Sequence, residues 1–130
     1  MGAGPGGGYA LGKTGTNQAA DNHKVAAARF GTSRHGWLGN PGKQSHVQVI
    51  TSDNPLETAT ELFSVLSKGG LIKDLPGRKG KVALFAPESP NGKISAFTLR
   101  IKSSQNDPAV DIKIVGPSGV KYKIHFERKA

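Results

Sequence analysis

Apolar residues recur at helical spacing in two segments of the chain. Residues 17–30 (NQAADNHKVAAARF) are rich in alanine, with the apolar side chains loosely on one side, and Gly31 follows as a stop. The clearest helix begins after Asn54, where Pro55 suits the first helical position and Glu57 is placed to complete a capping box. Both segments are predicted to be helices that bury one face.

The second helix has the stronger apolar stripe. Its members are Leu56, Ala59, Phe63 and Leu66, with Leu62 beside them. Gly69 and Gly70 are typical of a helix end.

Strand-like alternation follows each helix. In residues 45–51, Val47 and Val49 are predicted to face inward. His46 and Gln48 are then predicted to face outward.

Four further strands are predicted in the second half of the chain. They are residues 81–86, 93–102, 110–115 and 120–126, with a turn at residues 116–119 between the last two. Phe97, Leu99 and Ile101 are the inward side chains of the second of these strands. The order of elements predicts an α+β fold, with an N-terminal helix or helices packed on a twisted antiparallel sheet of four to five strands.

Composition divides the chain into a tail and one domain. Residues 1–18 are glycine-rich and are predicted to be a flexible linker or tail, and residues 19–130 a single basic α+β nuclease-like domain. Residues 7–14 (GGYALGKT) match the phosphate-loop pattern, but no strand precedes them and no parallel βαβ unit follows. We therefore reject nucleotide binding there.

The net charge of the chain narrows the range of possible functions. Lysine and arginine total 18 against 9 acidic residues, a formal net charge of +9 that attracts phosphate backbones. The absence of cysteine excludes disulfides, thiolate zinc sites and cysteine nucleophiles. No segment has the apolar length of a membrane span or the pattern of a signal peptide.

Alternation predicts that the charges gather on one face of the sheet. Tyr122, Ile124 and Phe126 suit the core, so Lys121, Lys123 and His125 face the other way. By the same alternation, Thr98, Arg100, Lys102 and Lys113 are predicted to face outward. Asp111 and Glu127 are the acidic exceptions.

Such a face suits RNA cleavage without a metal. Histidine can transfer protons near neutral pH, and lysine and arginine can offset the charge of the reacting phosphate. The shortage of carboxylates argues against a two-metal nuclease, and no metal or other cofactor is expected.

The candidate site follows from this chemistry. The proposed catalytic residues are His46, His125, Lys102, Arg100 and Thr98. The proposed substrate-binding residues are Lys43, Gln44, Gln48, Lys113, Lys121 and Lys123. His23 lies in the first helix, and His35, near Trp37, either helps to hold a base or closes the edge of the core.

Three short motifs over residues 40–128 carry a resemblance to a known group. They are Gly42-Lys43-Gln44 followed by His46, the helix NPLETATELFSVLSKGG, and the closing strand VKYKIHFE. Together they resemble the C-terminal nuclease domains of bacterial polymorphic and contact-dependent inhibition toxins, of the barnase/EndoU/colicin/RelE-like group. Ser45 stands where that pattern usually has lysine.

The resemblance implies a function and a partner. It implies an endoribonuclease toxin domain that cuts RNA, often tRNA, is secreted as part of a larger toxin and acts in the cytoplasm of the target cell. It also implies a cognate immunity protein, acidic in character. The alternatives are a noncatalytic RNA-binding module that uses the same face, and a structural protein whose charge is incidental.

Overall fold

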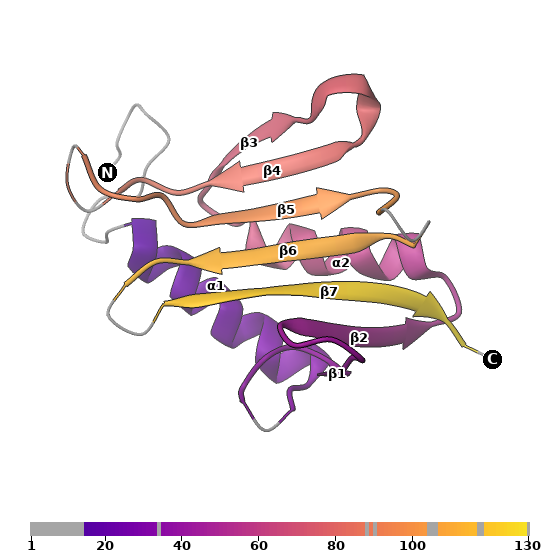
Figure 1. Ribbon diagram of the computed structural model, residues 1–130. Helices are drawn as coiled ribbons and strands as arrows, with labels where there is room; N and C mark the ends of the chain where they lie inside the picture. Colours follow the sequence, from indigo (N-terminus) through magenta and orange to yellow (C-terminus); the bar gives the residue numbers. More distant parts are fainter. Residues whose placement is uncertain are drawn as a thin grey trace.

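A computed structural model describes residues 15–33, 35–87, 89, 91–103, 107–116 and 119–129. Two helices lie on one face of a seven-stranded mixed sheet (Figure 1). The α+β class is confirmed, although the sheet has seven strands rather than four to five. Residues 1–14, which hold the phosphate-loop pattern and most of the predicted tail, are outside the described residues.

The elements follow one another along the chain in a simple order. They are α1 (Gly15–Phe30), β1 (Asn40–Pro41), β2 (Val47–Ser52), α2 (Pro55–Leu66), β3 (Leu71–Asp74), a short 3₁₀ turn (Pro76–Arg78), β4 (Gly80–Leu84), β5 (Ala96–Arg100), β6 (Ala109–Ile114) and β7 (Val120–Arg128). Residues 15–18, expected in the tail, form the first turn of α1. Neither described helix is both long and apolar enough to cross a membrane.

The strand order in the sheet is β1-β2-β7-β6-β5-β4-β3. Neighbouring strands are antiparallel except for β2 and β7, which run parallel. The expectation of a purely antiparallel sheet is therefore wrong at this one junction. Because β2 leads into α2 rather than into a hairpin with β7, no short turn dictates the relative direction of these two strands.

The two strands that the sequence did not predict are short and form the edges of the sheet. β1 has two residues, and all four residues of β3 are exposed. Neither strand has a buried face, so neither produces the apolar–polar alternation that identifies a half-buried strand. Sequence pattern therefore finds only the inner strands.

Polar side chains satisfy backbone groups at both ends of α2. Asn54 caps α2 as predicted, since its side-chain oxygen accepts a hydrogen bond from the Glu57 backbone N–H at 3.3 Å. The reciprocal half of the predicted capping box is absent: the Asn54 backbone N–H donates to Ser52 Oγ at 3.0 Å instead. At the other end of α2, the buried Asn22 of α1 donates from Nδ2 to the carbonyls of Leu66 and Lys68, both at 2.7 Å.

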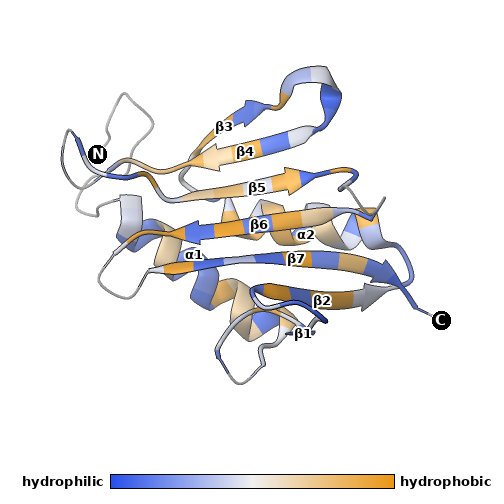
Figure 2. Ribbon diagram, viewed as in Figure 1, coloured by the Kyte–Doolittle hydropathy of each residue, from blue (hydrophilic) through white to orange (hydrophobic). Residues whose placement is uncertain are grey.

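The core fills the space between the helices and the sheet, and hydropathy alternates along the central strands accordingly (Figure 2). Phe97 and Leu99 are buried there as predicted. Leu56 and Ile101, also predicted to be inward, are 41% and 42% exposed. Ile101 follows the end of β5 at Arg100, and Leu56 lies on the first turn of α2, so neither is covered by the opposite layer.

Candidate polyanion-binding cleft

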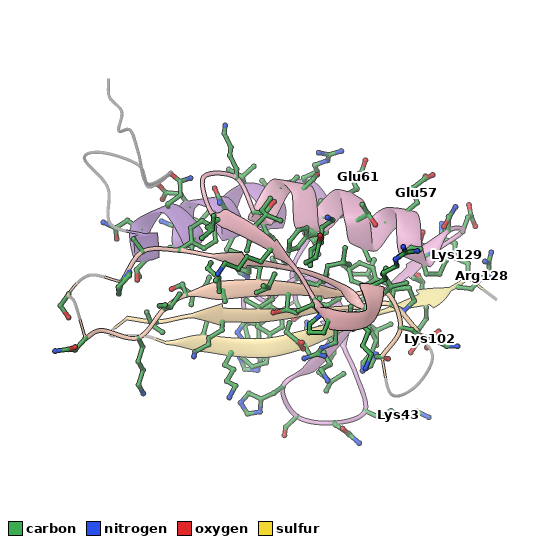
Figure 3. All side chains as sticks on the ribbon, turned by 90° about the horizontal axis from the view of Figure 1, so that it is seen from above. Lys43, Glu57, Glu61, Lys102, Arg128 and Lys129 are labelled. Atoms are coloured by element: carbon green, nitrogen blue, oxygen red, sulfur yellow. The ribbon has the colours of Figure 1, made fainter. Side chains whose placement is uncertain are left out.

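Charged side chains lie on both sides of the molecule. On the helical side, Glu57 and Glu61 point away from the sheet, whereas Lys43 lies on a loop beyond the opposite face (Figure 3). That opposite face is not covered by either helix (Figure 1). It is the face on which alternation predicted the cations.

Strand register brings the predicted residues into adjacent rows. Thr98 of β5 pairs with Asp111 of β6, Asp111 with Lys123 of β7, and Lys123 with Val47 of β2. Lys113 pairs with Lys121 in the next row. Paired residues on neighbouring strands project from the same face of a sheet, so these side chains surround one site.

The rows form the floor of an open cleft of about 760 Å³. Six of the predicted site residues line it: His46, Thr98, Arg100, Lys113, Lys121 and Lys123. Among the described lining residues there are four permanently cationic side chains and one carboxylate, that of Asp111. The cleft is therefore electropositive and suited to a polyanion.

Asp111 organises the cations at the centre of the cleft. Its Oδ2 accepts a hydrogen bond from Arg100 Nε at 2.7 Å, and its Oδ1 lies 4.0 Å from Lys123 Nζ. A carboxylate between two cations fixes their side chains. From the sequence alone, Asp111 is expected to be an acidic exception on the cationic face. Asp111 is two residues before Lys113 on the same strand, so both side chains lie on the same face. This alternation indicates that Asp111 belongs to the site.

His46 enters the cleft from the loop between β1 and β2. Its φ of +62° is in the left-handed region, which is uncommon for a residue other than glycine. Backbone hydrogen bonds hold this conformation: the Lys123 N–H donates to the His46 carbonyl at 2.9 Å, and the Gly42 N–H donates to the Val47 carbonyl at 2.8 Å. The backbone of His46 is thus anchored to β7 while its side chain stays exposed.

The predicted orientation of β2 is wrong. Val47 and Val49 lie on the open face, opposite Lys123 and His125, and Gln48 points to the helical side. Gln48 is 3% exposed, and its Nε2 donates to Ser33 Oγ and to the carbonyls of Leu38 and Gly39 at 2.9–3.3 Å. It holds the loop after α1 against β2, so its amide is turned away from the cleft in which substrate binding was predicted. Spacing alone could not show that loop carbonyls would satisfy a buried amide.

His125 lies on the predicted face but does not line the cleft. It pairs with Ala109 on one side and Val49 on the other, and it is 6% exposed. Its Nδ1 is buried and has no hydrogen-bond partner among the described residues. His125 is therefore buried outside the cleft, and its position does not support the proton transfer that we predicted for it.

The remaining predicted residues lie around the cleft rather than in it. Lys102 is exposed beyond the end of β5 and is not among the described lining residues. Lys43 and Gln44 belong to the loop that carries His46, and they line a second hollow next to it. Two predicted positions, Gln48 and His125, are therefore corrected, and these three are peripheral.

A buried aromatic group supports the cleft from the helical side. The Tyr122 hydroxyl accepts a hydrogen bond from the Leu38 backbone N–H at 2.9 Å and lies 2.7 Å from His23 Nε2. Burial lowers the pKa of His23 and raises the pKa of Tyr122. Burial therefore favours the neutral imidazole of His23, and its contact with the Tyr122 hydroxyl makes His23 a structural residue. Trp37 stacks on the Tyr122 ring, with centroids 4.7 Å apart and planes at 3°.

Comparison of the chain with known protein families, curated proteins and solved structures finds no match. The described residues also contain no group of three or more histidine, aspartate or glutamate side chains arranged to hold a metal ion. The function is therefore argued from the cleft itself.

Proposed function

We propose that this chain is a metal-independent endoribonuclease that binds RNA in the cleft on the open face of the sheet. The supporting observation is the convergence of one exposed imidazole, one carboxylate and four cations around a single opening. A polyanion-binding surface needs only the cations. The imidazole and the carboxylate add two groups that can carry a proton.

The chemistry of RNA cleavage assigns roles to these groups. The 2′-hydroxyl gives its proton to a base and its oxygen joins phosphorus, while the bond from phosphorus to the 5′-oxygen breaks and that oxygen takes a proton from an acid. The products are a 2′,3′-cyclic phosphate and a 5′-hydroxyl. Arg100, Lys121 and Lys123 would offset the charge that builds up on the phosphate oxygens.

We assign the two proton transfers to His46 and Asp111. Val47, next to His46, and Asp111 both pair with Lys123, so their backbones are about 10 Å apart, which is two strand spacings. A phosphate seated above Lys123 would then have the imidazole on one side and the carboxylate on the other. Thr98, which pairs with Asp111, would supply a hydrogen bond.

The test is cleavage of tRNA and total cellular RNA in excess EDTA. His46→Asn is the sharpest variant, because asparagine tolerates the left-handed backbone that His46 adopts but cannot exchange a proton. We expect it to slow cleavage by about 10²–10⁴-fold with an unchanged circular dichroism spectrum. Lys68→Ala, an exposed site at the end of α2, should cut at the wild-type rate. RNA that stays intact with the wild-type chain would refute the proposal.

RNA binding without cleavage is the second candidate function. The burial of His125 favours it, because one of the two imidazoles predicted for catalysis is withdrawn. Asp111→Asn separates the two functions. Removal of the one carboxylate among the described lining residues should tighten RNA binding in either case. It should slow cleavage only if Asp111 carries a proton.

The biological setting is proposed from the sequence resemblance. A toxin domain of this kind would cut tRNA in the cytoplasm of a target cell after delivery as part of a larger secreted protein, and a small acidic immunity protein would neutralise it. Expression of the chain in a bacterial host should then arrest growth, and His46→Asn should relieve the arrest. Normal growth at equal amounts of the wild-type and variant chains would contradict a toxin function.

A further inference from the structure

A second hollow adjoins the cleft on the other side of His46. Its volume is about 460 Å³, within the range of small-ligand sites. It shares three lining residues with the cleft: Ser45, His46 and Val47. A ligand that extends past His46 would therefore pass directly from one space into the other.

Trp37 is the main aromatic surface of this hollow. It is the one tryptophan of the chain, and it is only partly buried. One face of its indole is stacked on Tyr122, which is itself fixed by His23 and the Leu38 backbone. The indole is thus held in place before any ligand arrives, which reduces the entropy lost on binding.

The other side chains around Trp37 suit an aromatic, polar ligand. The ring centroids of His35 and His46 lie 5.4 and 5.5 Å from that of Trp37. Gln44 and Ser45 provide hydrogen-bonding groups, and Lys43 provides a positive charge. Among the described residues that line the hollow there is no carboxylate to repel a phosphate.

We infer that the hollow is a nucleobase subsite, in which Trp37 stacks on an unpaired base next to the phosphate held in the cleft. Aromatic side chains are the usual platforms for exposed bases, and amides bind the edges of bases. A base inside a duplex is stacked between its neighbours and cannot enter such a hollow without leaving the helix. The inference rests on the proposed RNA-binding function and narrows its substrate to unpaired RNA.

The first test uses Trp37 as its own probe. Nucleoside 5′-monophosphates are titrated into the chain with excitation where tyrosine does not absorb, and ribose 5-phosphate serves as the control without a base. We expect saturable quenching with the monophosphates and none with ribose 5-phosphate. Equal responses to both ligands would overturn the base subsite. Since no cleavage is involved, this result does not depend on whether the chain is an enzyme.

The second test compares variants on a labelled single-stranded RNA and on the same sequence annealed as a duplex. Trp37→Leu should weaken single-strand binding by about 5- to 150-fold, the contribution of one stacked base, and should leave duplex binding unchanged. Trp37→Phe keeps an aromatic ring over Tyr122 and should retain most of the single-strand preference, so it also guards against a loss caused by misfolding. Equal loss of single-strand and duplex binding by a folded Trp37→Leu would overturn the inference.

The two proposals can fail separately. Cleavage in EDTA without base-dependent quenching would retain the endoribonuclease and remove the subsite. Base-dependent quenching without cleavage would retain the subsite on a noncatalytic RNA-binding module.

Discussion

Burial sets the direction in which the pKa of His23 shifts. The His23 ring is largely removed from solvent between α1 and the sheet, and loss of hydration disfavours the charged imidazole, so the pKa of His23 is lowered. Its Nε2 lies 2.7 Å from the Tyr122 hydroxyl, which also accepts the Leu38 N–H.

The lowered pKa of His23 predicts a loss of stability in acid. Below the ordinary histidine value of 6.5, the unfolded chain binds a proton at residue 23 that the folded chain does not bind. The free energy of unfolding therefore has its full value above that pH and falls as the pH drops toward the lowered folded pKa. His23→Gln, which keeps an acceptor for Tyr122, should show a smaller fall.

The measurement is urea unfolding of both chains between about pH 8 and about pH 5. His35→Gln is the matched control, since His35 is exposed, and it should follow the wild-type profile. Parallel profiles for wild type and His23→Gln would mean that residue 23 binds protons equally in the folded and unfolded states.

Site residues could be predicted where a strand is long and its other face packs on the helices. On β5, β6 and β7 the inward positions are occupied by large apolar groups, so the outward positions of Thr98, Lys113 and Lys121 followed directly. His125 obeyed the same alternation, but how deeply a residue is buried depends on its neighbours in space, here Ala109 and Val49. Alternation gives the face of a side chain and not its exposure.

At the scale of elements, the sequence predicted every long element and neither edge strand. The two helices and the inner strands have a buried side, and burial imposes the spacing that the sequence displays. β2 is the exception, because its buried side carries Gln48 and Ser52, whose polar groups are satisfied by the Ser33–Gly39 loop and by Thr58. When a strand has polar residues on its buried side, the alternation of its sequence predicts the wrong side to be buried.

The contact between α1 and α2 depends on Asn22. Its amide donates to the Leu66 and Lys68 carbonyls at the end of α2, where the last carbonyls of a helix lack partners within the helix. Asn22→Leu would fill much of the same space but leave both carbonyls without this donor. We expect the free energy of unfolding to fall by about 1–3 kcal/mol, the cost of unsatisfied buried polar groups.

Urea unfolding of Asn22→Leu against Ser64→Ala measures this contribution. Ser64 is exposed on α2, and its hydroxyl bonds only within the helix, to the Glu61 carbonyl among the described residues, so its substitution should change stability by less than about 0.5 kcal/mol. An equally small change for Asn22→Leu would show that water replaces the amide at the end of α2.

The helical layer and the open face of the sheet have different roles in the molecule. The helical layer and the core hold the sheet in shape, while the open face presents the cations of β5, β6 and β7 as one field. Two of the nine acidic side chains of the chain, Glu57 and Glu61, lie on the side of α2 that points away from the sheet, where they do not weaken this field (Figure 3). Placement of charge, and not net charge alone, makes the cleft electropositive.

This arrangement predicts a defined dependence of RNA affinity on salt. Each lysine that contacts a phosphate of single-stranded RNA releases a counterion, so its removal should lower the slope of log K against log salt by about 0.7. Lys121→Ala should show this change in full. Lys123→Ala should show less, because Asp111 lies 4.0 Å from the Lys123 ammonium and already offsets part of its charge. Binding is measured by fluorescence anisotropy over a salt series, with Lys68→Ala as the control on the helical side. A slope that falls equally for Lys68→Ala would mean that RNA binds the whole surface and not the cleft.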